Sequence, residues 1–199
     1  MKLRGLYAIT PDDIGRVAAA VASGALCALQ YRNKSAPAAR RIEEARALAQ
    51  LCRRHGVPLI INDDLELALE VGAAGLHLGI ADGDLAAARA LLPGRILGAS
   101  CYDRLELARR AVAAGADYVA FGSVFASATK PCAVRAPLAL FAHDLGVPKV
   151  AIGGITAENA PQLVAAGADA VAVLSDLFDA PDVAARARQY AKVFAHGIA

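Results

Sequence analysis

Three polar side chains alternate with other residues in the segment Gln30-Tyr31-Arg32-Asn33-Lys34. Residues two apart in an extended strand point to the same side, so Gln30, Arg32 and Lys34 would share one face. Arginine offers a planar fork of donors to a phosphate group, and lysine offers a point charge. We therefore expect this face to clamp a ligand that carries phosphate. A solvated strand end is the alternative interpretation.

Two carboxylates are candidates for a metal site. Asp63 lies in the segment Asn62-Asp63-Asp64, directly after an apolar run, and Asp82 follows the next run, His77-Leu78-Gly79. Carboxylates held apart on a rigid scaffold suit Mg²⁺, which prefers oxygen ligands and also takes phosphate oxygens from a substrate. Because an aspartate before a helix can cap it, we expect Asp64 to cap the next helix and Asp63 to bind the metal.

A glycine pair marks a third candidate site, in the segment Ile152-Gly153-Gly154-Ile155, with Thr156 at an expected helix start. Backbone N–H groups can approach an anion closely where no side chain intervenes, and a helix N-terminus adds partial positive charge. In parallel βα barrels the phosphate site often follows strands 7 and 8. The segment is a candidate phosphate cradle, and a plain tight turn is the alternative interpretation.

The histidines and cysteines do not indicate covalent or acid–base catalysis. His77 lies within an apolar run, so we expect a packed, hydrogen-bonded core histidine rather than a general base. Cys101 and Cys132 follow predicted strands, but neither stands beside a histidine. We therefore expect small buried thiols and no nucleophilic side chain.

Composition excludes several classes of protein. The 199 residues carry 21 Lys and Arg against 19 Asp and Glu, without long charge runs and without Trp, so a nucleic-acid partner is not expected. The mean hydropathy of +0.42 comes largely from alanine, and every apolar run is shorter than the roughly 18 residues of a membrane span. The first residues do not form a signal peptide, and the cysteines form no C-x-x-C pair. We expect a cytoplasmic protein without a membrane partner.

The elements that position these residues follow from a repeated alternation of short aliphatic runs with Ala-, Leu-, Glu- and Arg-rich segments at helical spacing. The aliphatic runs predict buried strands at Leu6–Thr10, Ala25–Arg32, Pro58–Asn62, Gly75–Gly79, Arg95–Ser100, Tyr118–Gly122, Lys149–Gly154 and Ala170–Ser175. Helices are expected near 13–23, 36–55, 64–72, 84–92, 103–114, 136–145, 156–166 and 181–195.

Three joints between a helix and a strand look alike, at Val71–Gly75, Ala114–Asp117 and Ala166–Asp169. A glycine at such a joint ends the helix in the left-handed conformation. The recurrence indicates one repeating βα unit, and because parallel strands need helical crossovers, we expect an α/β fold, a (β/α)8 TIM barrel, as a single domain over residues 1–199. An open doubly wound sheet is the alternative, but no G-x-G-x-x-G follows the first strand.

In such a barrel the carboxyl ends of all strands face one mouth, where catalytic groups gather. Ser100 ends the fifth predicted strand, Ser127-Ala128-Thr129-Lys130 follows the sixth, and Ser175 ends the eighth. Together with the basic, acidic and glycine segments above, they predict one polar site at that mouth.

Taken together, these segments resemble the thiamine-phosphate synthase family. The resemblance is carried, in the family's order, by Gln30-Tyr31-Arg32-Asn33-Lys34, Ile61-Asn62-Asp63-Asp64, His77-Leu78-Gly79, Gly122 through Ser127-Ala128-Thr129-Lys130, and Ala151-Ile152-Gly153-Gly154-Ile155. It runs from Leu6 to about Phe178 and implies a (β/α)8 transferase of thiamine biosynthesis with Mg²⁺ as cofactor. Its small-molecule substrates would be hydroxymethylpyrimidine diphosphate and thiazole phosphate, and its products thiamine phosphate and pyrophosphate.

The resemblance also implies a role for each matching residue. The pyrimidine diphosphate would be held by Gln30, Arg32, Lys34, Asn62 and Lys130, with Ser100 touching the pyrimidine. The thiazole phosphate would be held by Ser127, Thr129, Gly154, Leu174 and Ser175. Asp63 and Asp82 would bind Mg²⁺. We expect a Mg-assisted dissociative displacement in which Arg32, Lys34, Lys130 and Ser100 take part in catalysis.

The chain departs from the family at a few positions. Ile80-Ala81-Asp82 stands where many members have Gln-Glu-Asp, so one acidic neighbour of the metal position is missing. Asn33 replaces an acidic residue and Ser127 a threonine, and the stretch from Pro131 to Arg135 is shorter than in many members. Neither the residues nor the resemblance predicts an oligomeric state.

Two alternative functions remain. A related thiazole tautomerase has a histidine two residues after the fifth-strand serine, where this chain has Tyr102. A non-catalytic phosphate-binding barrel would keep Gly153 and Gly154 but could lose the metal carboxylates, whereas Asp63 and Asp82 are both present.

Overall fold

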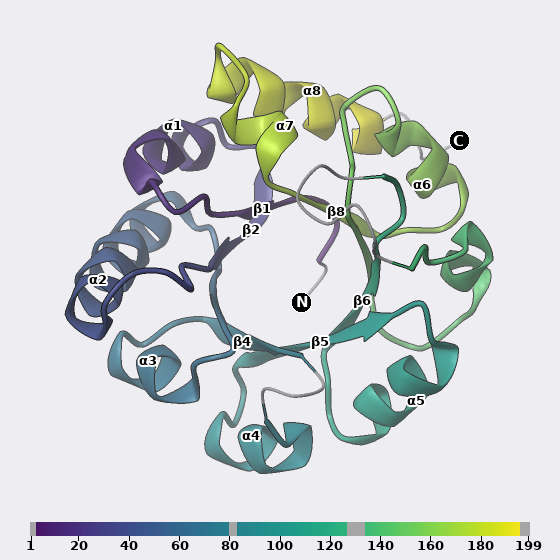
Figure 1. Ribbon diagram of the computed structural model, residues 1–199, viewed down its shortest axis with the longest axis horizontal. Helices are drawn as coiled ribbons and strands as arrows, with labels where there is room; N and C mark the ends of the chain where they lie inside the picture. Colours follow the sequence, from purple (N-terminus) through teal and green to yellow (C-terminus); the bar gives the residue numbers. More distant parts are fainter. Residues whose placement is uncertain (1–2, 80–82, 127–133, 196–199) are drawn as a thin grey trace.

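The computed structural model describes residues 3–79, 83–126 and 134–195. Eight parallel strands pair in chain order, and β1 also pairs with β8, so the sheet closes into a barrel with the helices around it (Figure 1). The predicted (β/α)8 barrel is therefore confirmed. The strands are β1 Gly5–Ile9, β2 Leu26–Tyr31, β3 Leu59–Asn62, β4 Gly75–Leu78, β5 Ile96–Tyr102, β6 Tyr118–Gly122, β7 Lys149–Ile152 and β8 Ala170–Val173.

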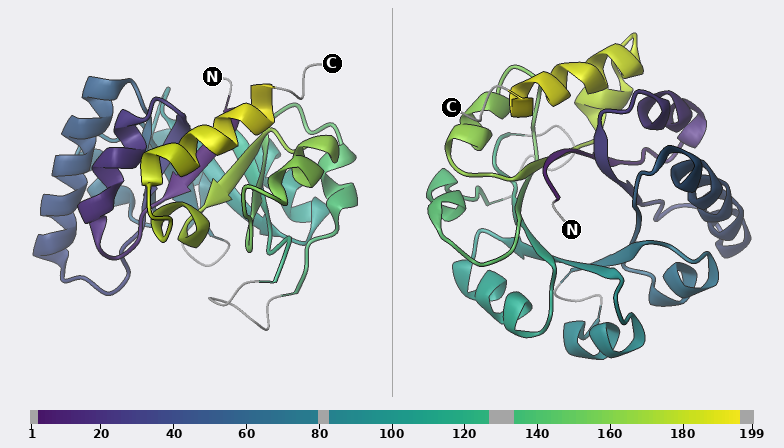
Figure 2. Two further views of the ribbon diagram at one scale, coloured as in Figure 1. Left: turned by 90° about the horizontal axis from the view of Figure 1, so that it is seen from above. Right: turned by 180° about the vertical axis from the view of Figure 1, so that it is seen from behind.

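The helices form the outer layer, which Figure 2 shows from above and from behind. They are α1 Val17–Ala22, α2 Ala38–His55, α3 Leu65–Glu70, α4 Leu85–Leu91, α5 Leu105–Ala113, α6 Ala160–Ala165, α7 Ser175–Phe178 and α8 Val183–Ala195, with 3-10 helices at Ile14–Arg16 and Leu138–Ala142. Among the described residues, no helix combines the length and the apolar character needed to cross a membrane.

Alternate residues of each strand face opposite sides of the barrel wall. In β1, Leu6 and Ala8 belong to the large apolar cluster between strands and helices, whereas Tyr7 and Ile9 belong to a smaller cluster with residues from the other strands. Small side chains in this second cluster, Ala120 and Ala172, line a cavity inside the barrel. That space is where the polar ends of the strands can meet.

One glycine is required by the packing of the barrel interior. Gly98 in β5 pairs with Tyr118 in β6, and a Cβ atom at Gly98 would overlap the Tyr118 ring. The missing side chain lets the aromatic ring lie directly against the neighbouring strand, where it is fully buried. The position and tilt of Tyr118 are therefore fixed by a close contact with backbone.

Several predicted helices differ from the observed ones. The segment predicted as a helix near 136–145 forms only the short 3-10 helix Leu138–Ala142, because Gly146 and Pro148 follow closely. The helix expected from Thr156 begins at Ala160, so Thr156 does not stand at a helix start. Its hydroxyl instead accepts a hydrogen bond from the N–H of Asn159 at 3.3 Å, within a turn.

The end of the eighth strand also differs from the prediction. β8 ends at Val173, and Ser175 begins α7, a single turn that the sequence pattern did not predict. Arg16 holds the end of this turn in place, because its guanidinium donates to the carbonyl oxygens of Phe178 and Ala180 at 2.6 Å each. The first and last βα units are thus joined by a side chain as well as by the sheet.

Candidate active site

A cavity of about 710 Å³ opens at the carboxyl ends of the strands. Every predicted site residue that the structure describes lines it: Gln30, Arg32, Lys34, Asn62, Asp63, Ser100, Gly154, Leu174 and Ser175. The remaining predicted residues, Asp82, Ser127, Thr129 and Lys130, lie outside the described residues. Segments more than 100 positions apart, such as Gln30 and Ser175, therefore contribute to one space, as the barrel topology requires.

A buried carboxylate on α2 determines which side chains of the basic segment 30–34 point into the cavity. Glu44 of α2 accepts hydrogen bonds from the Tyr31 hydroxyl at 2.9 Å and from the Asn33 amide at 3.1 Å. These two residues therefore point away from the cavity, and Arg32 and Lys34 point into it, as predicted. Asn33 also accepts a hydrogen bond from the Ala36 N–H at 3.1 Å, so its side chain holds the turn before α2 and does not line the cavity.

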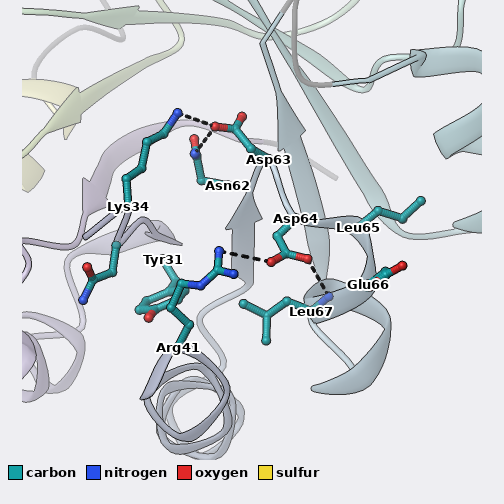
Figure 3. Close-up of a pocket in the computed structure, with 10 residues that line it drawn as sticks. Tyr31, Lys34, Arg41, Asn62, Asp63, Asp64, Leu65, Glu66 and Leu67 are labelled. Atoms are coloured by element: carbon teal, nitrogen blue, oxygen red, sulfur yellow. Dashed lines mark hydrogen bonds and ion pairs between the residues drawn. The ribbon is translucent and has the colours of Figure 1, made fainter. Parts of the chain in front are cut away.

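Asp63 lies at the cavity beside the basic segment. Its Oδ2 atom accepts a hydrogen bond from Asn62 Nδ2 at 2.6 Å and lies 2.8 Å from Lys34 Nζ (Figure 3). Asp63 has a positive φ of 63°, a left-handed conformation that aspartate tolerates better than most residues. Its N–H donates to the carbonyl oxygen of His77 at 2.9 Å, which anchors this bend to the neighbouring strand.

The bend separates the two neighbouring carboxylates. Asp64 caps α3 by accepting from the Leu67 N–H at 2.9 Å, and it also faces Arg41 at 3.3 Å, in a second hollow of about 550 Å³ (Figure 3). The prediction that Asp64 caps the helix is confirmed. Asp63 lies at the edge shared by the two hollows, and both of its side-chain contacts with described residues use Oδ2, so none of these residues binds Oδ1.

A magnesium site is consistent with the described residues only in part. Asp63 offers a hard carboxylate oxygen next to the cationic side chains that would hold a phosphate, and this donor chemistry fits Mg²⁺. Within residues 3–79, 83–126 and 134–195, no group of three or more His, Cys, Asp or Glu side chains could hold a metal. The second predicted ligand, Asp82, lies outside these ranges.

A chain of hydrogen bonds crosses the floor of the cavity. Gln30 Nε2 donates to the Tyr7 hydroxyl at 3.0 Å, which lies 2.7 Å from the Tyr118 hydroxyl. The Tyr118 hydroxyl lies 2.8 Å from His77 Nδ1, and His77 Nε2 lies 2.9 Å from Ser100 Oγ. Five side chains from five different strands are thereby linked.

His77 is packed and hydrogen-bonded, as predicted, but it faces the cavity rather than the helix layer. It is 7% exposed, and burial lowers the pKa of its imidazole to about 4 despite the smaller opposing effect of the Asp63 carboxylate. The imidazole is therefore neutral near pH 7, with one nitrogen available as an acceptor.

The glycine pair is required by packing. A Cβ atom on Gly153 would overlap Ser123, and one on Gly154 would overlap the backbone at Ala126, while both residues have a positive φ. The turn after β7 therefore fits closely against the segment after β6, and both line the cavity. Nearby, Asp176 accepts a hydrogen bond from the Tyr190 hydroxyl at 2.6 Å, which holds α7 against α8.

Some cavity residues were not predicted from the sequence. They are Tyr7, Tyr102, Asp103, Arg104, Ser123 and Asp176. Tyr7 could have been predicted, because it lies two residues from Ile9 in β1 and both side chains therefore face the inside of the barrel. Tyr102 could not have been predicted from the spacing of residues, because its place at the rim depends on a positive φ of 52° where the strand ends.

Comparison with known proteins gives a consistent result. The family model described as thiamine monophosphate synthase matches residues 6–177. The chain is 55% identical over 200 residues to thiamine-phosphate synthase of Methylobacillus flagellatus, covering 96% of both chains. It is 57% identical over 203 residues to the protein of that name from Aromatoleum aromaticum, covering 97% of each.

Solved structures give the same result. Thiamine phosphate pyrophosphorylase from Pyrococcus furiosus superposes with a TM-score of 0.87 at 31% identity, covering 100% of this chain and 98% of that one. A 3-hexulose-6-phosphate synthase superposes with a TM-score of 0.68 at 17% identity, which is a likeness of fold alone.

Proposed function

The chain belongs to the thiamine monophosphate synthase family and is a transferase, and on this premise we propose that it joins hydroxymethylpyrimidine diphosphate to a thiazole phosphate. The products are thiamine phosphate and pyrophosphate. The observation that carries the proposal is the placement of Arg32 and Lys34 on the wall of a cavity that also has a polar floor. Such a cavity suits a ligand with a diphosphate group and an aromatic ring.

We propose that the reaction begins with cleavage of the C–O bond between the methylene carbon of the pyrimidine and the oxygen that links it to the first phosphorus of the diphosphate. The electron pair leaves with pyrophosphate, and the aminopyrimidine ring releases electrons to the methylene carbon. The lone pair of the thiazole nitrogen then forms the new C–N bond. The atoms and charges balance without a proton transfer from the protein.

In this mechanism the protein supplies position and charge. Arg32 and Lys34, with Lys130, donate hydrogen bonds to the departing diphosphate, and fixed donors of this kind need little reorganisation as negative charge develops. Gln30 and Asn62 orient the same substrate, and Ser100 contacts the pyrimidine from the cavity floor. The thiazole phosphate takes the other part of the cavity, at Gly154, Leu174 and Ser175. Ser127 and Thr129, which the resemblance assigns to the same phosphate, lie outside the described residues.

Mg²⁺ would be held by Asp63 and Asp82, and when bound it would supply positive charge for the phosphate oxygens of the leaving group. Asp63 already faces the cavity, and its carboxylate is held by Asn62 and Lys34. The metal site would therefore lie beside the basic segment that binds the same diphosphate.

The thiols within the described part of the chain do not suit a covalent mechanism, and Cys132 lies outside that part. Cys101 is fully buried, and burial raises the pKa of its thiol to about 12, so it is protonated at neutral pH. Cys27 has a thiol whose pKa burial also raises to about 12. Direct displacement needs no such nucleophile.

The proposal is tested by mixing both substrates with Mg²⁺ and measuring pyrophosphate release. We expect Arg32→Ala to lower the rate by about 100-fold or more, the usual effect of removing one donor to a developing charge. Arg46→Ala is the matched control, because Arg46 lies on α2, is exposed and pairs with Glu70 instead of lining the cavity. Pyrophosphate release that is absent in the unmodified protein, or unchanged in Arg32→Ala, would contradict the proposal.

A further inference from the structure

The hydrogen bonds on the cavity floor form a series from Gln30 through Tyr7, Tyr118 and His77 to Ser100. Tyr7, Tyr118 and Gln30 are buried, and only the Ser100 end of the series is partly exposed at the cavity. Buried polar groups are nearly always hydrogen-bonded, so the direction of each bond can be worked out by counting donors and acceptors.

The direction of the hydrogen bonds is set at the Gln30 end of the series. Its amide nitrogen is only a donor, so the Tyr7 oxygen accepts there, and the single Tyr7 proton must be used elsewhere. Among the residues that the structure describes, the neighbour that can accept this proton is the Tyr118 oxygen at 2.7 Å. Tyr118 then has its own proton to donate, and His77 Nδ1 is the acceptor at 2.8 Å.

The rest of the series follows from this step. With Nδ1 as an acceptor, the imidazole proton lies on Nε2 and is donated to Ser100 Oγ at 2.9 Å. Ser100 therefore accepts from the protein, and its own hydroxyl proton is left for the cavity. In the opposite direction, His77 Nδ1 would donate to Tyr118 and Tyr118 to Tyr7, and the Tyr7 proton would face Gln30 Nε2, which cannot accept it. A doubly protonated imidazole would leave the same proton unpaired.

We propose that Tyr118 and His77 are positioning residues that make Ser100 an obligatory hydrogen-bond donor to the ligand. The ligand atom that meets Ser100 must then be an acceptor. Given the proposed function, on which this assignment of the ligand rests, that atom is a ring nitrogen of the aminopyrimidine and not its exocyclic amino group. The series thus selects the orientation of the pyrimidine ring in the cavity.

Packing keeps the series in one arrangement. The Tyr7 and Tyr118 rings meet edge to face with centroids 5.8 Å apart, and the His77 ring stacks on Tyr118 at 5.5 Å. Gly98 leaves no space for Tyr118 to move toward β5. Because the rings cannot turn freely, the tautomer of His77 is decided by the Tyr118 hydroxyl.

The direction of the series is tested on the free protein, without substrate. Two-bond ¹⁵N–¹H spectra of protein labelled at histidine report which imidazole nitrogen carries the proton, and His77→Gln identifies the His77 signals. We expect the proton on Nε2. A proton on Nδ1, or a mixture of the two tautomers, would overturn the proposal.

Two matched variants test the role of Tyr118. Tyr118→Phe removes the hydroxyl that donates to Nδ1, so we expect a mixture of tautomers. Tyr7→Phe removes the hydroxyl of the tyrosine that precedes Tyr118 in the series. Tyr118 can still donate to His77 Nδ1, so we expect the imidazole proton to stay on Nε2. Identical spectra for the two variants would overturn the role of Tyr118. A merely structural role would lower the stability of both variants without this difference.

The nature of the ligand atom is tested by binding. Affinities are measured for the pyrimidine diphosphate and for analogues in which a ring nitrogen is replaced by C–H or the amino group by hydrogen. We expect one ring-nitrogen analogue to bind on the order of 10-fold more weakly, and Ser100→Ala to remove that difference. If Ser100→Ala removed the effect of the amino group instead, the donor role would be wrong. If the parent compound did not bind, the proposed function would fail, while the tautomer spectrum would still decide the direction of the series.

Discussion

Nζ of Lys34 lies 2.8 Å from Oδ2 of Asp63, so the cation proposed to bind phosphate and the carboxylate proposed to bind Mg²⁺ are paired with each other. The pair connects the loop after β2 to the end of β3. Each group holds its partner at the cavity in the absence of ligand. Binding of a diphosphate together with a metal would exchange this single contact for two, one with phosphate and one with the metal.

Replacing Lys34 tests this exchange. Lys34→Ala removes one donor to the diphosphate and also frees Asp63, so we expect turnover to fall by roughly 10- to 100-fold while Mg²⁺ alone binds no more weakly. Steady-state kinetics measures turnover, and a Mg²⁺ titration without substrate measures the binding of the metal alone. Lys34→Arg keeps the charge and should recover part of the rate. Equal kinetics of the alanine variant and the unmodified protein would contradict the role of Lys34.

The two neighbouring carboxylates should behave differently. Asp63→Ala should raise the Mg²⁺ concentration at half-maximal activity by about tenfold or more, because a hard oxygen ligand is lost. Asp64→Ala removes the cap of α3 and should lower the free energy of unfolding by about 1 kcal/mol without moving the Mg²⁺ midpoint. Chemical denaturation and a Mg²⁺ titration of both variants distinguish these effects. A shifted midpoint in Asp64→Ala alone would reverse the assignment.

Gly98 should tolerate no side chain. In Gly98→Ala the new Cβ overlaps the Tyr118 ring, so we expect a loss of about 1–3 kcal/mol of unfolding free energy and a disturbed Tyr118–His77 hydrogen bond. Gly24→Ala is a control for backbone conformation alone, since Gly24 has a φ of +70° but open space around it, and it should cost about 1 kcal/mol. Urea denaturation compares the two, and an equal or smaller loss at Gly98 would argue against the close contact.

Burial of neutral His77 predicts acid sensitivity. Its folded-state pKa of about 4 lies below the ordinary value of 6.5, so it contributes stability above pH 6.5 that is lost as the pH falls toward 4. The full effect corresponds to roughly 3 kcal/mol. His77→Gln can accept from Tyr118 and donate to Ser100 without titrating, so its unfolding free energy should fall less over this range. Parallel pH curves for the two proteins would contradict the prediction.

The sequence predicted those parts of the site that depend on local spacing. The alternation of Gln30, Arg32 and Lys34 follows from strand geometry, and the capping role of Asp64 follows from the adjoining helix start. The glycine pair was identified, but its position relative to a helix was wrong, because Asn159 and Thr156 form a turn before α6 begins.

Contacts across the barrel could not be predicted in this way. Tyr7 and Tyr118 are 111 residues apart, and their hydroxyls meet because β1 and β6 face each other across the interior. A single sequence shows which strands are apolar but not the register that brings two side chains to the same depth. α7 was missed for a different reason, since four residues are too few to show a helical period.

The pairing of β1 with β8 has a consequence for how the protein is made. During synthesis β1 can pair with β2 at one edge, but its other edge has no partner until β8 is made about 160 residues later. A nascent chain that stops before Ala170 can form individual βα units, but it cannot complete the ring. Substrate affinity should therefore arise late and all at once during translation, when the last strand becomes available to the first.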